Sequence, residues 1–178
     1  MIVETGAGIP TANALVTLVE FDTYLTDYGI SATGTDDEKT AAIVRASLWV
    51  STYPDWTGDM TYGRGLQGLA IPRSGMTDCN GDTVPSDEVP TEAKQAIYIA
   101  AAAELTTPGV LTPTITPGKQ QKRVKVDVIE IENMTPADQG KSRVDPVMAL
   151  RPVLTQIEDL LRCLASFRRT STPWPQVL

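Results

Sequence analysis

Histidine is absent from this sequence of 178 residues. It is the commonest general base, the usual activator of a serine or cysteine nucleophile, and the commonest metal ligand. Adjacent acids such as Asp36 with Asp37 are typical of charges that complement a helix N-terminus rather than of an acid–base pair. We therefore expect no enzyme, with no catalytic, cofactor-binding or metal-binding residues.

Cysteine and long apolar runs are also scarce. The two cysteines, Cys79 and Cys163, lie far apart in different expected elements, and no basic segment followed by an apolar run opens the chain. These features predict reduced thiols in a cytoplasmic setting. No run approaches the roughly 18 apolar residues that a membrane span needs, so no membrane partner is expected.

Aromatic residues and positive charge are in short supply as well. Aromatics make up 6% of the chain, which holds 13 glycines and 13 prolines, and this composition predicts long irregular connections within one domain of ordinary size. The net charge of −7 repels nucleic acid unless a local basic patch overrides the field. A protein that wraps DNA is therefore disfavoured.

A pair of glycines near the start resembles part of a phosphate-binding loop. Gly6 and Gly8 precede an apolar helical pattern, but no buried strand comes before them and no Gly-Lys-Ser/Thr sequence follows. A lone Gly-x-Gly is weak evidence for nucleotide binding. We expect residues 1–16 to form a flexible, extended N-terminal arm.

Two capping boxes mark the starts of two helices. Each has a threonine followed three residues later by a glutamate, and the pairs are Thr17 with Glu20 and Thr35 with Glu38. In such a box each side chain accepts a hydrogen bond from the other residue's amide, which satisfies two donors at the helix start. The boxes predict helices over residues 18–28 and 36–53.

A third helix is expected after Pro90, where "AKQAIYIAAAAEL" permits close approach of a neighbouring helix until the next proline. Residues 55–89 separate it from the second helix. So long a loop is usually functional or braced by partners. Its acids invite comparison with a calcium loop that starts at Asp78, but Thr83 and Val89 stand where glycine and glutamate are required, so an ordinary turn is favoured.

A strand pattern occupies residues 121–132. Apolar residues alternate with charged ones and then change phase, which predicts a bulge or a turn between two short strands. The apolar positions are Val124, Val126, Val128, Ile129 and Ile131. Because a short strand needs a ladder partner, we expect these residues to form an intersubunit strand with a neighbouring copy.

The same segment carries the marked basic cluster of the chain, Lys119, Lys122, Arg123 and Lys125. A groove for single-stranded nucleic acid needs aromatic rings among such residues for base stacking. The sequence has no aromatic residue between Gly109 and Ala165, and acidic residues follow the cluster at once. A solvated strand face or an intersubunit salt bridge is favoured, and nucleic-acid binding stays open as the alternative.

The C-terminal segment shows the strongest amphipathic pattern. It predicts a helix over residues 152–168, whose apolar stripe is either core or a docking face for a partner. The extended tail, residues 169–178, places Trp174 between two prolines and is either an interface anchor or a disordered end. The candidate portal or intersubunit contacts are Leu161, Leu164, Phe167, Arg168, Arg169, Trp174 and Leu178.

Together these elements predict a mainly α fold. Residues 17–168 form a small bundle of about four helices with a long loop and a short β-strand pair or hairpin. Extended N- and C-terminal arms flank this domain.

Four separated stretches of the chain are "VETGAGIPTANALVTLVEFDTYL", "IPRSG", "NGDTVPSDEVPTEAKQA" and "VDPVMALRPVL". Taken in order, they resemble a family of small tailed-bacteriophage proteins found among head-morphogenesis genes. Its members are often labelled DnaT-like single-stranded-DNA-binding proteins, though they resemble head–tail connector, or adaptor, proteins. The resemblance spans Val3 to about Leu154, and the residues that follow lie outside it.

The resemblance implies a structural virion protein of the neck, assembled in the cytoplasm of a bacterial host. It would form a ring of twelve copies on the portal protein, join the head to tail or stopper proteins, and continue the channel through which double-stranded DNA passes. No catalytic residues are implied. The alternative is the single-stranded-DNA binding that the label names.

Overall fold

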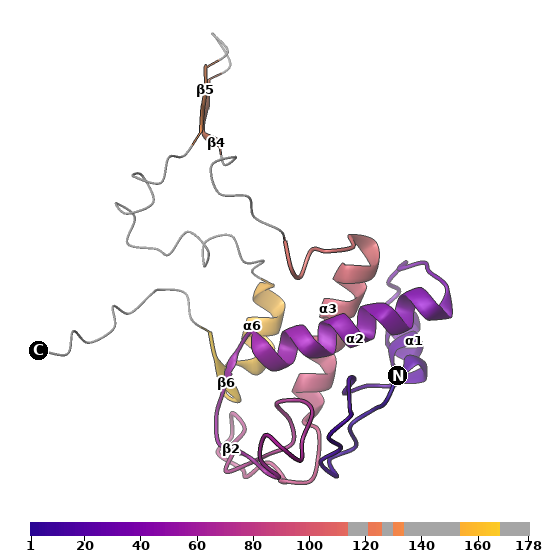
Figure 1. The fold of residues 1–178 in the computed structure, drawn as a ribbon, viewed down its shortest axis with the longest axis vertical. Helices are drawn as coiled ribbons and strands as arrows, with labels where there is room; N and C mark the ends of the chain where they lie inside the picture. Colours follow the sequence, from indigo (N-terminus) through magenta and orange to yellow (C-terminus); the bar gives the residue numbers. More distant parts are fainter. Residues whose placement is uncertain (114–120, 126–129, 134–153, 168–178) are drawn as a thin grey trace, which may run out of the picture. The chain divides into compact units, whose positions relative to one another are not determined.

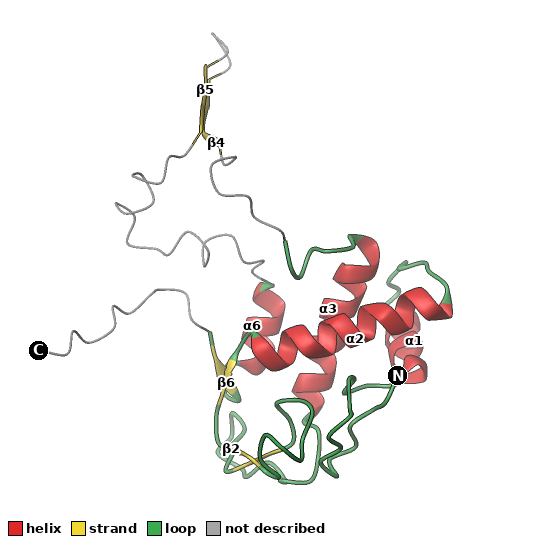
Figure 2. Cartoon of the chain, in the orientation of Figure 1, coloured by secondary structure: helices red, strands yellow, loops and turns green. Residues whose placement is uncertain are grey.

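The computed structural model describes residues 1–113, 121–125, 130–133 and 154–167. The chain divides into two units, one of Met1–Leu111 with Val153–Phe167 and one of Thr112–Pro152 with Arg168–Leu178. Among the described residues, the first unit holds four helices and the second holds a strand pair (Figures 1 and 2). A mainly α fold with a short antiparallel strand pair is therefore confirmed.

Helices α1 (Leu18–Asp27) and α2 (Asp36–Thr52) begin where the capping boxes predict. In each box the threonine hydroxyl accepts from the glutamate amide, and the glutamate carboxylate accepts from the threonine amide. Gly29, just beyond α1, has a φ of 62°, the left-handed conformation that ends a helix without steric cost. The two predicted helices are confirmed to within one residue at their ends.

Helix α3 (Thr91–Thr106) follows Pro90 and is the centre of the helical unit. It packs extensively on α2 and also contacts α6 (Thr155–Leu161) and α1 (Figure 1). Ala96 and Ala100 of α3 are 0% exposed, as is Ala46 of α2. Small side chains let two helix backbones approach closely. The alanine-rich stretch of α3 therefore packs against a neighbouring helix, as the sequence predicts.

Residues 1–16 fold onto the helical unit, so the expectation of a flexible arm is wrong. Val3 and Ala14 form a parallel bridge, and Leu15 and Val16 are 1% and 0% exposed. The composition of the segment did not reveal this because its partners lie far away in the sequence. The N-terminal segment is part of the core.

The long connection between α2 and α3, residues 55–89, is braced by the chain itself. Strand β1 (Asp55–Trp56) pairs with β6 (Ala165–Ser166), and β2 (Asp59–Met60) pairs with β3 (Arg73–Ser74), both antiparallel. These ladders satisfy backbone groups that partner subunits were expected to satisfy. Bracing by partners is therefore not required.

Two side chains fix the interior of that connection by donating to main-chain carbonyls. Arg73 donates to the carbonyls of Thr57, Gly58 and Ala70. Gln67, 3% exposed, donates to the carbonyls of Leu69 and Pro72. These bonds supplement the two short ladders of this segment.

The C-terminal helix is shorter than its apolar pattern predicts. Helix α6 ends at Leu161, and the chain then turns into β6 instead of continuing to residue 168. The amide and hydroxyl of Thr57 both donate to the carbonyl of Leu164, at 3.0 and 2.8 Å. Pairing with the long connection therefore replaces the last helical turns, which the local pattern could not show.

The second unit is described by strands β4 (Gln121–Lys125) and β5 (Glu130–Asn133), which pair antiparallel with a register shift between Gln121 and Arg123. The predicted strand pair is confirmed. Val124 faces Ile131 of the same chain, so this ladder does not need a neighbouring copy. The intersubunit role of the segment stays a prediction; Val126, Val128 and Ile129 lie outside the described residues, as does the tail.

Candidate functional site

The glycine loop near the N-terminus binds an anion that the chain itself supplies. The Glu4 carboxylate, 1% exposed, accepts hydrogen bonds from the amides of Gly6 at 2.9 Å, Gly8 at 3.0 Å and Ile9 at 2.7 Å. Successive backbone amides of this kind bind phosphate in other proteins. Here the cradle is filled by Glu4, so the loop does not offer a nucleotide site. The sequence signal that was missed is an acid two residues ahead of Gly-x-Gly.

The glycines of this loop are required by contact as well as by conformation. Their φ angles are 106° at Gly6 and 72° at Gly8. A Cβ on Gly6 would lie 1.7 Å from the carbonyl oxygen of Asp87, and one on Gly8 would lie 2.2 Å from the ring of Tyr62. The Glu4 loop thus fastens the N-terminal segment to the long connection.

A cleft of about 420 Å³ lies beside this loop and is lined in part by Glu4, Glu20, Glu88 and Lys94. The Lys94 ammonium lies 2.9 Å from the Glu20 carboxylate. Burial alone would raise the pKa of Glu20, but hydrogen bonds from Lys94 and the capping Thr17 outweigh it and hold the pKa below its usual value. The cation in this cleft is therefore already paired within the chain.

The helical unit is strongly acidic. Residues 1–113 and 154–167 carry 17 aspartates and glutamates against 6 lysines and arginines. Three of those bases form ion pairs, Lys39 with Asp22 at 2.7 Å, Arg45 with Glu104 at 2.8 Å, and Lys94 with Glu20. Arg73 is held by carbonyls. In the part of the chain that the structure describes, Arg64 and Arg162 are exposed and have no ion pair.

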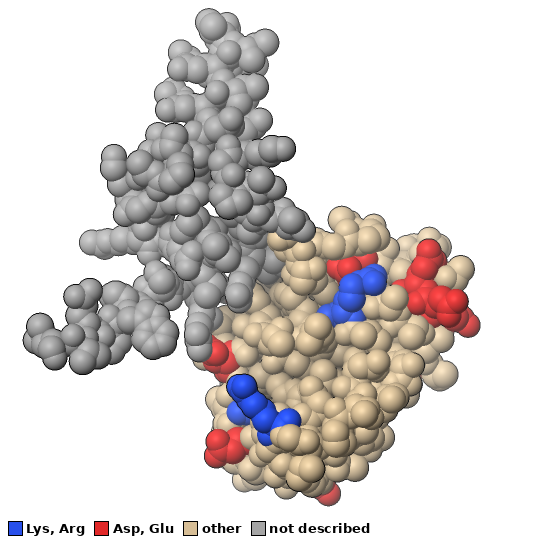
Figure 3. Space-filling view, viewed as in Figure 1, with Lys and Arg blue, Asp and Glu red and all other residues tan. Residues whose placement is uncertain are grey.

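On the face shown in Figure 3, the blue side chains lie in small groups with broad tan areas between them, and red side chains lie near these groups. A phosphate backbone is bound by a continuous run of cations. The described face carries no such run. The face of the helical unit in this view therefore offers no continuous basic surface.

Glu104 fixes the point at which the chain leaves the helical unit. It is 2% exposed and accepts from Arg45 Nε and from the amides of Gly109, at 2.9 Å, and Leu111, at 3.3 Å. A buried carboxylate is tolerated only when it is paired and hydrogen-bonded in this way. The exit at Leu111 is consequently a defined position on the unit.

The register of β4 and β5 places opposite charges at facing positions. Arg123 faces Glu132, and Lys125 faces Glu130. Oppositely charged residues at facing positions of an antiparallel pair are a stabilising combination. Lys122 lies at the register shift, and Lys119 is outside the described residues. Arg123 and Lys125 of the basic cluster thus stand opposite acidic residues in the register of this ladder.

Cys79 and Cys163 form a disulfide, so the expectation of reduced thiols is wrong. The pairing of β1 with β6 carries the end of α6 to the turn that holds Cys79, and the two Cα atoms lie 5.2 Å apart despite a sequence separation of 84 residues. Cys79 is exposed and Cys163 is half-buried. Two cysteines allow one pairing, but nothing local in the sequence shows that they meet.

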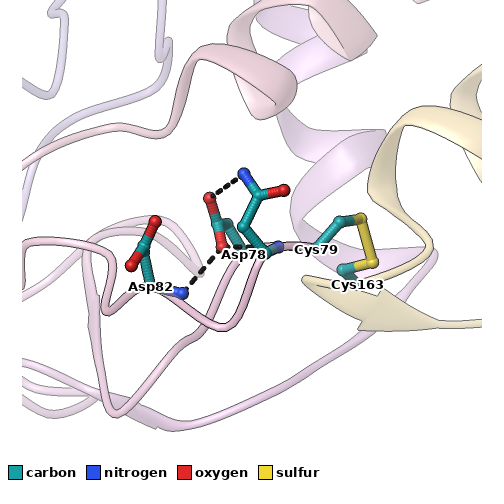
Figure 4. The surroundings of a disulfide bond; sticks show 5 residues. Asp78, Cys79, Asp82 and Cys163 are labelled. Carbon is teal, nitrogen blue, oxygen red and sulfur yellow. Dashed lines mark hydrogen bonds between the residues drawn. A yellow bond between two sulfur atoms is a disulfide. The ribbon is translucent and has the colours of Figure 1, made fainter.

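The turn around Cys79 is held by Asp78 (Figure 4). The Asp78 carboxylate accepts from the amides of Asp82, at 2.9 Å, and Asn80, at 2.8 Å. These bonds, that from Asp82 first, hold the pKa of Asp78 below its usual value. Among the described residues no group of three or more acidic or cysteine side chains is placed to hold a metal ion. The turn is an Asx-type loop, as the sequence favours.

The structure separates the candidate contacts of the C-terminal segment. Leu161 and Leu164 are 0% and 2% exposed and lie in the hydrophobic core, which is one of the two roles that the apolar stripe allowed. Phe167 is half-buried, its ring centroid 5.6 Å from that of Tyr53. The remaining candidates, Arg168, Arg169, Trp174 and Leu178, lie outside the described residues. Within those residues, no helix is long and apolar enough to cross a bilayer.

A family model described as "Putative DnaT-like ssDNA binding protein" matches residues 1–173. The chain belongs to this family. A search of the curated proteins and a search of the solved structures found no match. The family's range runs well past Leu154, where we expected the resemblance to end, so α6 and β6 belong to the family's domain. Burial of Ile157, Leu161 and Leu164 in the same core agrees with that range.

Proposed function

We propose that the chain is a structural subunit of a tailed-bacteriophage head–tail connector, in which twelve copies form a ring on the portal and continue the DNA channel. The observation that carries the proposal is the division of the chain into an acidic, internally bonded helical unit and a basic remainder that leaves it. The division alone does not name an assembly. The head–tail connector is proposed because four sequence stretches resemble phage head-morphogenesis proteins.

The acidic unit suits the wall of a DNA channel. Each phosphate contact made by a lysine or arginine adds binding free energy, so a basic wall would retain DNA as it passes. In the helical unit the bases Lys39, Arg45 and Lys94 are neutralised by acids of the same chain. Excess negative charge there repels the duplex and leaves it free to move.

The basic remainder supplies a complementary surface for assembly. Residues 114–153 and 168–178 carry 9 lysines and arginines against 5 aspartates and glutamates. A two-stranded ladder by itself is marginally stable in water, so a pair such as β4–β5 would gain stability by packing on another surface. Contact between one copy's basic segment and the next copy's acidic unit is heterologous, and heterologous contacts generate rings when the rotation closes.

The test is assembly of the full chain with and without the portal protein of the same phage. We expect a closed ring of twelve copies by negative-stain microscopy and native mass spectrometry, and dissociation as salt screens the charges. Replacing Lys119, Lys122, Arg123 and Lys125 by glutamate should abolish the ring. The matched control replaces the exposed Arg64 and Arg162 of the helical unit and should leave it intact. A chain that stays monomeric with the portal at low salt contradicts the proposal.

Single-stranded-DNA binding is the second candidate, and the description of the family favours it. The bases outside the helical unit would have to make the contacts, because those within it are largely paired. Fluorescence anisotropy with labelled oligothymidylate tests this. Binding should weaken with salt, with a slope of about 0.7 per phosphate contact. Neutralising Lys122, Arg123 and Lys125 should reduce that slope by about 2. No anisotropy change at low salt excludes it.

A further inference from the structure

We propose that the Cys79–Cys163 disulfide is a reversible redox latch that holds residues 162–167, which follow α6, against the long connection when oxidised and releases them when reduced. The proposal rests on the contacts of the helical unit alone. It does not depend on whether the chain forms a connector.

The disulfide is accessible to reagents in solution. Cys79 is exposed in the turn that Asp78 holds, and Cys163 is half-buried at the end of α6 (Figure 4). Thiol–disulfide exchange requires a thiolate to reach one of the two sulfurs, so access is the first condition for a reversible bond. Cys79, as an exposed residue, meets that condition.

The turn around Cys79 does not need the disulfide for its shape. Asp78 binds the amides of Asn80 and Asp82, the amide of Asp78 donates to the carbonyl of Asp82 at 2.9 Å, and Thr77 forms a bridge with Thr83. After reduction the turn therefore keeps Cys79 in place. Reoxidation can restore the same pairing.

Besides the disulfide, residues 162–167 are tied to the long connection by a short ladder and by hydrogen bonds. Strand β6 contributes two residues to its ladder with β1, and Thr57 donates twice to the carbonyl of Leu164. The disulfide covalently joins residues 84 apart at this same junction. Helix α6 itself is anchored by Ile157 and Leu161, both 0% exposed. Leu164 and Ala165, 2% and 4% exposed, also pack in the core. Reduction removes the covalent tie and should make opening of residues 162–167 more frequent, while α6 stays packed.

The chemistry is a two-electron exchange. A thiolate of a small dithiol attacks the Sγ of Cys79, the disulfide bond breaks, and its electron pair leaves with the Sγ of Cys163, which takes up a proton. The second thiol of the reagent then displaces Cys79, so two cysteine thiols and one oxidised reagent are formed. Glutathione disulfide reverses the reaction by accepting the same two electrons.

The experiment measures local opening in the purified full chain by trypsin cleavage after Arg162, which is exposed beside Cys163. We expect cleavage to become at least tenfold faster on reduction with dithiothreitol and to return to its original rate with glutathione disulfide. Cleavage after Arg45, in the middle of α2, should stay slow in both states and serves as the control for global unfolding. The melting temperature should fall by about 10 °C on reduction, because the closed loop is long.

Cys79→Ser and Cys163→Ser provide a second test, since each should show the reduced chain's cleavage rate whatever reagent is present. If either variant fails to fold, reduction of the folded wild-type chain still gives the comparison. Three results would overturn the proposal: both cysteines alkylated in the protein exposed to oxidant, an unchanged rate after Arg162, or a melting temperature that moves by less than about 2 °C.

Discussion

At Glu4, a single carboxylate converts a glycine-rich segment into a closed loop. Its two oxygens accept from the amides of Gly6, Gly8 and Ile9, so one buried and two partly buried donors are satisfied. Charge-assisted bonds to backbone amides are stronger than neutral ones. The segment that resembles part of a phosphate-binding loop thus has a structural role, and Glu4 stabilises it.

Replacing Glu4 by alanine should lower the free energy of unfolding by about 3 kcal/mol, because it leaves one buried and two partly buried amides without their acceptor. Glu4→Gln should cost about 2 kcal/mol, since one acceptor oxygen remains but the charge is lost. Urea unfolding followed by circular dichroism measures both. The control is Glu88→Gln, an exposed acid of the same cleft, which should change the stability by less than about 0.5 kcal/mol. An equal effect of Glu4→Ala and Glu88→Gln would contradict the assignment.

Tyr98 predicts how the protein responds to alkali. Burial, together with the nearby Glu20 charge, raises the pKa of Tyr98 to about 12. The folded state favours the neutral phenol of Tyr98. Its contribution to the free energy of unfolding is therefore fully present below about pH 10 and is lost between pH 10 and 12. Absorbance titration should show a native step above pH 11, and Tyr98→Phe should remove it. All 5 tyrosines titrating together near pH 10 in the folded protein would refute this.

At the scale of elements, the capping boxes are the clearest case in which local sequence determines structure. Thr17→Ala and Thr35→Ala should each lower the free energy of unfolding by about 1 kcal/mol, because each leaves a helix-start amide without its acceptor. Thermal and urea unfolding measure the loss. The conservative variants Thr17→Ser and Thr35→Ser keep the hydroxyl and should stay within about 0.5 kcal/mol. A serine variant as unstable as its alanine counterpart would show that the hydroxyl is not the cause.

Elements whose ends depend on neighbouring residues in sequence were predictable, and those whose ends depend on distant residues were not. The boxes at Thr17 and Thr35 lie within one helical turn, so the starts of α1 and α2 followed from the sequence. The end of α6 depends on Thr57, more than 100 residues away, which binds the carbonyl of Leu164. An apolar stripe cannot report that contact. The predicted helix to residue 168 failed for this reason.

The features of the candidate site also separate into those that local sequence predicts and those that depend on distant residues. The phase change of the strand pattern gave the β4–β5 pair, because alternation is a property of each strand alone. Burial of Glu4 and the meeting of Cys79 with Cys163 depend on segments that approach only in the folded chain. The sequence shows which residues are basic. It does not show that Lys94 pairs with Glu20, because the two lie 74 positions apart.

At the scale of the whole molecule, the helical unit should fold without the segment that interrupts it. Replacing residues 114–150 by a flexible Gly/Ser linker of about twelve residues keeps both parts of the unit. We expect a cooperative unfolding transition and helical circular dichroism like that of the full chain, together with loss of the ring. Far-ultraviolet dichroism and native mass spectrometry measure the two. A variant that is unfolded would show that the unit depends on the removed residues.

The tail tests the portal contact separately from the ring. Deleting residues 170–178 removes Trp174, the residue type most often found at binding hot spots. Attachment to the portal should fall, while the helix content of the chain stays unchanged. Co-sedimentation with portal particles measures attachment, and Trp174→Phe is the milder comparison. Full attachment of the truncated chain would exclude the tail as a portal contact.

The turn beside the disulfide also bears on the chemical ageing of the protein. Asn80 followed by Gly81 is the sequence most prone to deamidation, a reaction in which the glycine amide nitrogen attacks the asparagine side chain. Here the amide of Gly81 donates to the carbonyl of Asp78 at 3.2 Å, and the side-chain amide of Asn80 donates to the Asp78 carboxylate at 3.2 Å. Both reacting groups are therefore restrained. Slow appearance of isoaspartate during storage would report an intact turn, and rapid appearance would report its loss.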